Sequence, residues 1–544
     1  MRKFAATLLA LLAACSPSAT SAQPLKPDAP KLVVAISVDQ LSGDLFDEYR
    51  GHFTGGLKRL AEGSTLYRNG YQSHAATETC PGHSTLLTAK RPATNGIVAN
   101  TWIDQKAARA DKTIYCAEDE SVPGSTSSAY TVSPKHLNAQ TFGDRLKAVS
   151  PASRNVAVAG KDRAAVMMGG RNVDQRWYWD GKAFGTDLKG AAVPRTVAAF
   201  NMALANAIAT ARPALSPPPL CQAKARAYQL TPALKVGDNR FERAAGDTRQ
   251  FRISPEFDGA TLALAGALVQ EMQLGRGQAT DLLSIGLSAT DYVGHAYGSG
   301  GMEMCLQMLA LDRELGDFLS LLDRSGIDYA VVLTGDHGGM DIPERLRDKG
   351  IAGAARAEAG LAASEVGKLL APQFGRTESV LKGIGIGGDI WVDAGVPAAQ
   401  RDAVLRAAKQ RYAAHPQVQA ALTSAEVMAV PMPTGSPDKW SVSQRVRASF
   451  DPARSGDLYV VLKQYISPIA APSAGYAATH GSPWDYDRRV PILFWRKGGR
   501  PLASEQAVET IDIMPTLAAL VGVPVQRASV DGKCLPAAGI ACPR

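Results

Sequence analysis

The sequence is poor in three features that would point to common functions. It has seven cysteines among 544 residues and no CxxC pair, which argues against a cysteine-rich zinc site. It has no run of five or six basic residues, although its formal net charge is +8, so we expect no nucleic-acid partner. Beyond the N-terminus it has no apolar run long enough to cross a bilayer. With 45% hydrophobic and 20% charged residues, it is typical of a globular protein.

The N-terminus has the pattern of an export signal. Two basic residues precede the apolar run FAATLLALLAA, and small residues follow in SPSATSAQ. We predict a signal peptide over residues 1–22, cleaved after Ala22, and a periplasmic or secreted mature protein over residues 23–544. The alternative is a lipobox at Leu12–Cys15, which would leave a lipid anchor on Cys15. We favour cleavage near Ala22.

The cysteines favour disulfides. Removal of Cys15 leaves six, an even number in a protein that we expect to be exported. Six cysteines allow fifteen pairings. Their spacing suggests one local pair, Cys534 with Cys542, which would clamp the C-terminal tail.

Five apolar runs next to polar residues predict an α/β fold. Runs that are apolar almost throughout indicate strands covered on both faces, and therefore a largely parallel sheet flanked by helices. The runs are KLVVAISVDQ (31–40), NVAVAGKDR (155–163), DLLSIGLSATDYVGH (281–295), YAVVLTGDHGG (329–339) and VPILFWRKGG (490–499). In such sheets, ligands bind beyond the carboxyl ends of the strands.

The segments between these runs divide into regular helices and two less regular stretches. Residues 303–322 carry an apolar stripe at helical spacing, from Met304 to Leu322, which we interpret as core. Residues 164–275, with a hairpin turn predicted at Asp180-Gly181, and residues 341–480 are less regular. We interpret both as insertions that cap the edge of the sheet in one catalytic domain over residues 23–544.

Carboxylates and imidazoles gather at the ends of the predicted strands. A carboxylate with an imidazole is a ligand set that zinc prefers, although each pair alone is as well explained by an ion pair or a buried histidine. Three carboxylates and three imidazoles together suffice for two metals. They are Asp39, Asp291, His295, Asp336, His337 and His480.

The order of the motifs resembles the alkaline phosphatase superfamily. It is most similar to the branch with a threonine nucleophile, which contains bacterial alkaline phosphatases and nucleotide pyrophosphatase/phosphodiesterases. The motifs that carry this resemblance are SVDQ at 37, TETCPGH at 77, IVANTWID at 97, GKDR at 160, TDYVGH at 290, TGDHGG at 334 and ATHGS at 478. Each motif is weak alone, and their order over residues 32–535 makes the resemblance specific.

The resemblance implies roles for individual residues. Thr79 is the expected nucleophile and would form a covalent phosphothreonine. One zinc would be held by Asp291, His295 and His480, and a second by Asp39, Asp336, His337 and the oxygen of Thr79. The family pattern gives no metal to His74 or His83. A sulfatase interpretation fails because its C-x-P-x-R motif is absent around Cys80.

Two basic residues favour phosphate monoesters as substrates. A monoester dianion has one more charged oxygen than a diester, so the pair Lys161 and Arg163 suits the monoester, and Asn100 could donate a hydrogen bond to one phosphoryl oxygen. On sequence alone, the pair is as well explained by a solvated loop and Asn100 by a turn beside Trp102. We therefore predict an exported, zinc-dependent alkaline phosphatase that acts on small phosphate monoesters as a monomer. The alternatives are a phosphodiesterase or nucleotide pyrophosphatase, and a non-catalytic metal- or phosphate-binding protein. Exposed aspartates in the insertions could also bind a structural Ca²⁺.

Overall fold

The structure is a computed structural model that describes residues 25–537 and 539–543. The predicted signal peptide and the lipobox cysteine Cys15 lie outside these residues. Within them, no helix is both long enough and apolar enough to span a bilayer.

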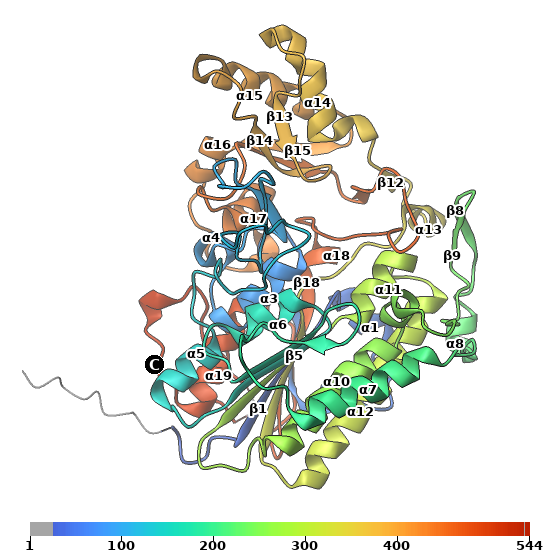
Figure 1. Cartoon of the computed structure of the whole chain (residues 1–544), viewed down its shortest axis with the longest axis vertical. Helices are drawn as coiled ribbons and strands as arrows, with labels where there is room; N and C mark the ends of the chain where they lie inside the picture. The colour runs from blue at the N-terminus through green and yellow to red at the C-terminus, as the bar shows by residue number, and fades with distance from the viewer. Residues whose placement is uncertain (1–24, 538, 544) are drawn as a thin grey trace, which may run out of the picture.

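The core is a ten-stranded, mostly parallel sheet (Figure 1). Its strands are β1 (Leu32–Val38), β2 (Thr65–Tyr71), β5 (Asn155–Ala159), β6 (Gln175–Trp179), β7 (Phe184–Gly185), β10 (Asp281–Leu287), β11 (Tyr329–Gly335), β18 (Arg489–Arg496), β19 (Leu502–Ser504) and β20 (Val508–Glu509). Their order is β19-β2-β18-β11-β1-β10-β5-β6-β7, with β20 paired to β2. The predicted α/β class and the largely parallel sheet are confirmed.

One strand differs in direction from what its composition suggests. β18 runs antiparallel to both of its neighbours, β11 and β2, although it is as apolar as the parallel strands. A continuous apolar run reports burial on both faces and does not report direction. The sequence therefore identified this strand but not its orientation.

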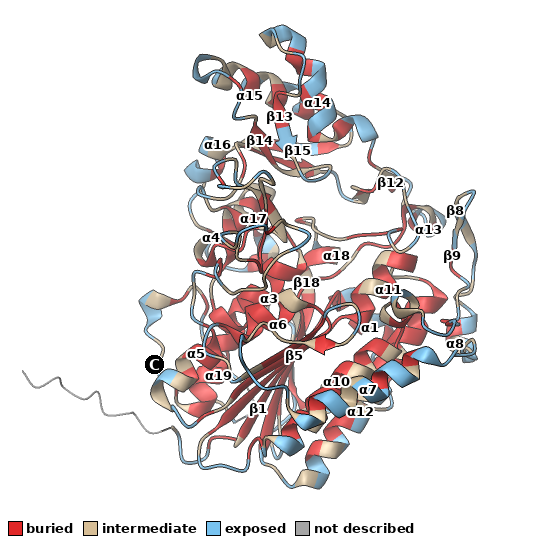
Figure 2. Ribbon diagram, viewed as in Figure 1, coloured by how far each residue is buried: buried red, intermediate tan, exposed pale blue. Residues whose placement is uncertain are grey.

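Helices cover both faces of the sheet, as the red, buried strands of Figure 2 show. Along β1, Leu32, Val34 and Ile36 point into one core, and Val33 and Ala35 point into the other, as the two-residue period of a strand requires. The first core contains side chains from α1 (Gly43–Tyr49), α2 (Gly56–Gly63), α10 (Glu256–Glu271), α11 (Ala289–Tyr297) and α12 (Met302–Ser325). The second contains side chains from α3 (Thr79–Thr88), α5 (Phe142–Val149), α6 (Asp162–Gly169) and α19 (Ile513–Val521). The predicted stripe from Met304 to Leu322 is buried in α12.

The segment 341–480 carries a second sheet, and we refer to this segment as the cap. The sheet has the order β13-β14-β16-β15 and lies above the central sheet in the view of Figure 1. Its elements are β13 (Leu381–Gly383), β14 (Gly388–Val392), β15 (Val418–Thr423), β16 (Leu458–Leu462), α14 (Ala363–Leu370) and α15 (Ala398–Ala413). They enclose a hydrophobic core of their own, with Val366, Val404 and Val460. We propose that this segment is an insertion that covers the edge of the central sheet.

The first part of the segment 164–275 adds two strands to the central sheet, and the rest lies outside the sheet. The hairpin predicted at Asp180-Gly181 is formed by β6 and β7, which extend the sheet. The chain then forms α7 (Arg195–Ala209), α8 (Pro219–Gln222), the hairpin of β8 (Tyr228–Thr231) with β9 (Leu234–Val236), and α9 (Thr248–Arg252). We keep 164–275 as a proposed insertion, although its first residue lies within α6.

Three disulfides join the six remaining cysteines. Cys534 pairs with Cys542, which confirms the local pair expected from the sequence. Cys221 pairs with Cys305 and attaches α8 to α12. Cys80 pairs with Cys116 and attaches the first turn of α3 to the segment after β4 (Thr113–Tyr115).

Candidate active site

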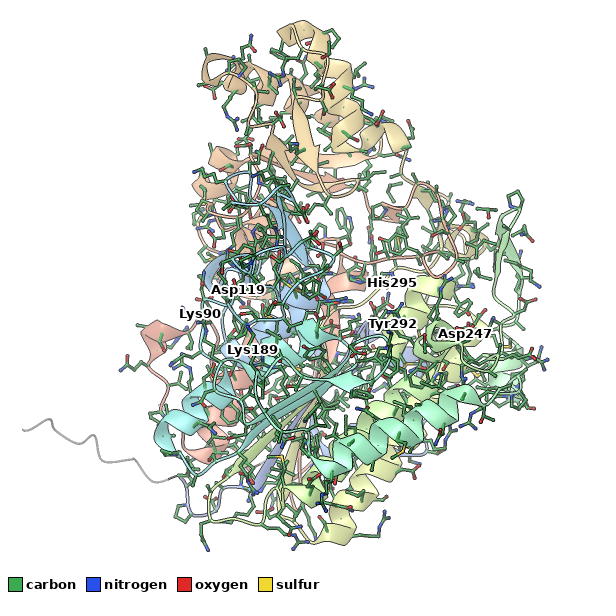
Figure 3. All side chains as sticks on the ribbon, in the orientation of Figure 1. Lys90, Asp119, Lys189, Asp247, Tyr292 and His295 are labelled. Atoms are coloured by element: carbon green, nitrogen blue, oxygen red, sulfur yellow. A yellow bond between two sulfur atoms is a disulfide. The ribbon has the colours of Figure 1, made fainter. Side chains whose placement is uncertain are left out.

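The central strands deliver polar side chains to one edge of the sheet. Asp39 follows β1, Asp336 follows β11, and Lys161 lies two residues after the end of β5. Because β5, β10, β1 and β11 are consecutive neighbours and parallel, their carboxyl ends meet at the same edge. Figure 3 labels Tyr292 and His295 of α11, the helix after β10, between the central sheet and the cap.

Thr79 is the first residue of the buried helix α3. Its neighbour Glu78 has extended backbone angles and is the N-cap residue. α3 packs closely against the loop after β11, since a Cβ atom at Gly82 would collide with the carbonyl oxygen of Asp336. The threonine hydroxyl therefore lies at the edge of the sheet on a helix whose position is fixed by packing.

A first group of possible metal ligands surrounds Asp291. The Nε2 atom of His480 lies 3.2 Å from Asp291 Oδ1, and the Nε2 atom of His295 lies 3.4 Å from the same oxygen. Asp291 and His295 share a face of α11 because they are four residues apart. The ring of His337 stacks on that of His480 with a centroid distance of 3.6 Å. Asp291, His337 and His480 have ligand atoms close enough to hold one ion.

A second group surrounds Asp336. It consists of Asp39, His83 and Asp336, whose ligand atoms are also close enough for one ion. His83 bridges the two carboxylates, with its Nε2 atom 3.2 Å from Asp39 Oδ1 and its Nδ1 atom 3.1 Å from Asp336 Oδ2. His337 Nε2 lies 3.2 Å from Asp336 Oδ2, so this ring is within reach of both groups.

The position of His83 differs from the expectation. The family pattern gives this histidine no metal, yet the structure places it between two of the expected ligands. His83 lies four residues after Thr79 on α3, so that one helical turn brings both onto the same face. That spacing was present in the sequence and could have identified it.

The histidines are held in an orientation typical of metal ligands. The Nδ1 atom of His295 hydrogen-bonds the carbonyl oxygen of Ala478, and that of His480 hydrogen-bonds the carbonyl oxygen of Thr77. His337 Nδ1 bonds a backbone carbonyl in the same way. Because a carbonyl only accepts, each Nδ1 carries a proton, and each Nε2 faces the carboxylates, where it can bind a metal ion once it is deprotonated.

Within the described residues, several buried carboxylate oxygens of these groups have no recorded partner except the imidazoles and Lys161. They are both oxygens of Asp39, Oδ1 of Asp291 and Oδ2 of Asp336. Burial raises the pKa of Asp336 to about 6, and repulsion by Asp39 adds to this. Buried carboxylates gathered this closely need a compensating cation. The residues therefore fit two divalent metal ions.

Lys161 and Arg163 lie beside the threonine hydroxyl. Lys161 Nζ is 3.4 Å from Thr79 Oγ1 and also contacts Asp39 Oδ2 at 2.7 Å and Asp291 Oδ2 at 2.5 Å. Arg163 Nη2 is 3.5 Å from Thr79 Oγ1. Burial opposes the charged form of Lys161, but Asp291 and Asp39 outweigh it and raise the pKa of the ammonium group. Lys161 therefore stays charged.

Asn100 is tied to the start of α3. Its side-chain Oδ1 atom accepts a hydrogen bond from the backbone N–H of Cys80 at 2.8 Å, and its backbone N–H donates to Glu78 Oε2 at 2.6 Å. The Cys80–Cys116 disulfide joins α3 to the residue whose backbone N–H donates to the carbonyl oxygen of Asn100 at 2.9 Å. The structure thus brings the four expected reaction residues to one place: Thr79, Asn100, Lys161 and Arg163.

A pocket of about 400 Å³ lies next to His295 and His480, between the central domain and the cap. Its lining from the central domain includes Glu78, Asn100 and Thr101. Its lining from the cap includes Asp389 and the glycine-rich loop 384–388. His295 and His480 also lie on its wall, so the pocket adjoins the candidate reaction centre.

The chain belongs to the family of type I phosphodiesterases and nucleotide pyrophosphatases. The model of that family matches residues 33–483, which is most of the sequence. The resemblance to the alkaline phosphatase superfamily inferred from the motif order is thereby confirmed.

Two curated relatives match nearly the whole chain. Alkaline phosphatase PhoK of Sphingomonas sp is 51% identical over 508 residues, with 93% of this chain and 91% of the relative covered. Alkaline phosphatase PhoD of Zymomonas mobilis is 44% identical over 526 residues, with coverage of 94% and 89%.

Solved structures agree with the fold. A crystal structure of alkaline phosphatase PafA superposes with a TM-score of 0.80 and 25% identity, over 92% of this chain and 97% of that one. A further structure of PafA is that of a variant in which a threonine, an asparagine, a lysine and an arginine are substituted. Murine ectonucleotide pyrophosphatase/phosphodiesterase 5 shares the fold with a TM-score of 0.51 and 13% identity.

Proposed function

We propose that this chain is a zinc-dependent alkaline phosphatase, a phosphoric monoester hydrolase that acts through a covalent phosphothreonine. The observation that carries the proposal is the position of Lys161 and Arg163, whose nitrogens lie 3.4 and 3.5 Å from the hydroxyl of Thr79. Two cations beside one nucleophile suit a dianionic phosphoryl group. The names of the relatives PhoK, PhoD and PafA, all alkaline phosphatases, support it.

We propose the ligand sets that the family resemblance implies. One Zn²⁺ would be held by Asp291, His295 and His480, and the other by Asp39, Asp336, His337 and Thr79 Oγ1. When bound, the two ions supply Lewis acidity that favours the alkoxide of a threonine and stabilises the leaving oxygen. The short contacts of His83 with Asp39 and Asp336 add this histidine to the residues that hold the second ligand set in place.

The protein's own residues then carry the chemistry. Thr79 Oγ1 attacks phosphorus, so that the Oγ1–P bond forms and the bond from phosphorus to the leaving oxygen breaks. Water subsequently attacks the phosphothreonine, releases phosphate and restores the hydroxyl. Lys161 and Arg163 compensate the charge on the phosphoryl oxygens in both steps, and Asn100 is positioned near the start of α3 to contact one of them.

A phosphodiesterase or nucleotide pyrophosphatase is the second candidate. The observation in its favour is the family model, whose description names those activities. The metal groups alone do not distinguish the two reactions, because both need a polarised phosphorus and a stabilised leaving oxygen. The basic pair beside Thr79 favours the monoester.

The deciding experiment compares the two substrate classes. We would purify the mature protein with zinc, measure its metal content, and determine kcat/KM for p-nitrophenyl phosphate and for bis-p-nitrophenyl phosphate at one pH. We expect about two zinc ions per chain and a higher kcat/KM for the monoester. A higher kcat/KM for the diester would establish the second candidate, and zinc binding without turnover of either substrate would contradict both.

We also propose that the protein is exported and acts as a monomer on small phosphate esters. The three disulfides support an oxidising compartment. Measurement of the N-terminal residue of the mature protein would separate cleavage after Ala22 from lipidation of Cys15. A structural Ca²⁺ stays a prediction, which the same metal analysis would test.

A further inference from the structure

The pocket beside the reaction centre differs in charge from the rest of the molecule. The chain as a whole has a formal net charge of +8. Among the described residues that line this pocket, none is a lysine or an arginine, whereas two are carboxylates, Glu78 and Asp389. The pocket wall is therefore acidic, although the protein as a whole is basic.

The two carboxylates come from separate parts of the chain. Glu78 is the N-cap of α3, and its Oε1 atom faces Gly481, where an added Cβ would lie 3.8 Å from it. Asp389 lies in β14 of the cap, and its Oδ1 atom accepts a hydrogen bond from the backbone N–H of Gly456 at 2.7 Å. Burial raises the pKa of Asp389 to about 7, and the charge of Glu78 contributes. At alkaline pH the Asp389 carboxylate is therefore ionised.

Aromatic rings complete this wall. Trp391, Tyr459 and Tyr476 line the pocket with the two carboxylates. The ring of Tyr476 is 46% exposed and lies 5.4 Å from the ring of His295, at the boundary between the pocket and the reaction centre. Tyr459 is buried, and the nearby charges of Asp389 and Glu78 add to the effect of burial in raising its pKa. Carboxylates and aromatic faces together attract organic cations.

We propose that this pocket binds the leaving group of the substrate and selects phosphate monoesters whose alcohol carries a positive charge, such as an amino alcohol or a quaternary ammonium alcohol. The proposal rests on the proposed function and names the substrate class of the same site. The phosphoryl group lies at Thr79 among Lys161 and Arg163, while the cation of the alcohol lies between Glu78, Asp389 and the aromatic rings. Alcohols with a carboxylate or further phosphates are disfavoured, because no basic side chain in the described lining compensates them.

The test uses esters that differ only in charge. Phosphocholine has a quaternary nitrogen where 3,3-dimethylbutyl phosphate has a carbon, so their shapes match. We would measure the ratio of their kcat/KM values in wild type and in Asp389→Asn, which keeps an oxygen that can accept from Gly456 and removes the charge. Because both proteins use the same two esters, intrinsic differences between the leaving groups cancel. We expect the choline preference to fall about five- to tenfold in the variant.

A matched control comes from Asp457, the residue directly before β16 in the cap. Asp457 also accepts a backbone hydrogen bond, from Val392 at 2.7 Å, and it is not among the residues that line the pocket. Asp457→Asn should leave the ratio unchanged. Retained turnover of 3,3-dimethylbutyl phosphate shows that each variant is folded.

The outcomes separate this inference from the proposed function. No turnover of either ester by the wild type would contradict the proposed function. Turnover of the neutral ester, with an equal ratio in wild type and Asp389→Asn, would overturn the inference alone. A measurement on the wild type is independent of any variant: choline should inhibit p-nitrophenyl phosphate hydrolysis competitively at lower concentration than 3,3-dimethylbutanol does, and equal inhibition would also overturn it.

Discussion

The edge of the central sheet and the wall of the cap face the same pocket but are built differently. At the sheet edge, Asp39, Asp291 and Asp336 are almost completely buried, and short contacts hold them among imidazoles and Lys161. At the cap, the loop 384–388 is rich in glycine and partly exposed, and Ile384 is 51% exposed. The first region is fixed by packing from both cores, and the second can vary with little effect on it.

This difference suggests a division of labour. Groups that stabilise charge in a transition state need fixed positions, because reorganisation would cost much of the benefit. A leaving-group pocket needs only complementary charge and shape, which a cap with its own core can supply. We therefore expect substitutions of the buried groups at the sheet edge to abolish turnover, and substitutions in the loop 384–388 and at Asp389 of the cap to change substrate preference.

The largest effect should follow from loss of the nucleophile. Thr79→Ala should reduce kcat by about three decades or more, because no covalent intermediate can form. Thr79→Ser should retain part of the activity, since the hydroxyl survives. Mass spectrometry of acid-quenched enzyme should locate phosphate on Thr79. Phosphate on Ser84, whose hydroxyl donates to the carbonyl of Pro81, would instead disprove the assignment.

Loss of a metal ligand should be nearly as severe. Asp291→Ala should release one of two zinc ions per chain and abolish turnover, since His295 and His480 both contact this carboxylate. Chelation of the wild type should have the same effect, and added zinc should reverse it. Asp119→Ala is the control. Asp119 forms an ion pair with Lys135 and belongs to neither metal group. Full activity in Asp291→Ala would show that this ligand is misassigned.

The basic pair should act on one substrate class more than on the other. Lys161→Ala/Arg163→Ala should lower kcat/KM for a monoester by about two to four decades, at roughly one to two decades for each charge-assisted contact. A diester, with one charged oxygen fewer, should lose much less. The readout is the monoester/diester ratio at one pH, with metal content measured in both proteins. An unchanged ratio at equal zinc content would mean that the pair does not contact the phosphoryl group.

The disulfides should separate activity from stability. The Cys80–Cys116 disulfide spans 36 residues, and its loss should lower the unfolding free energy by about 4 kcal/mol. The Cys534–Cys542 disulfide spans 8 residues, and its loss should lower it by about 2–3 kcal/mol. Alanine at Cys80 and Cys116 should also lower kcat/KM about tenfold, because the hydrogen bonds between Asn100 and the start of α3 lose the support of the disulfide. Alanine at the C-terminal pair should leave kcat/KM unchanged. Equal kcat/KM in both double variants would indicate that the first disulfide has no role in the site.

The smallest effect concerns pH and the cap. Burial raises the pKa of Asp389 to about 7 from an unfolded value near 4, so the folded state binds the proton more tightly. The stability that this proton provides is present below about pH 4 and is lost as the pH rises through 7. The difference in unfolding free energy between Asp389→Asn and wild type should therefore shift in favour of the variant by on the order of 2 kcal/mol from pH 4 to pH 8. This is less than the full pKa shift would give, because a side chain that lines a pocket keeps part of its hydration. Parallel curves of unfolding free energy against pH for wild type and Asp389→Asn would contradict this.

The sequence alone was sufficient to predict the strands and the charged groups that lie next to them in the chain. Strand-length apolar runs predicted the sheet, because burial on both faces requires apolar residues at every position. The turns that follow them, GKDR, TDYVGH and TGDHGG, carried the charged groups that the structure brings to one edge. Asp291 and His295 are four residues apart, a spacing that on a helix brings two side chains to one face, as α11 shows.

Only the tertiary structure decided which distant residues meet. The antiparallel direction of β18, the pairing of Cys80 with Cys116 and of Cys221 with Cys305, and the bridge from His83 to Asp39 and Asp336 all depend on long-range packing. The acidic wall is the clearest case, since Glu78 and Asp389 lie far apart in the chain and meet only because the cap folds over the start of α3. Local patterns specify what a residue can do, and long-range packing specifies which partners it has.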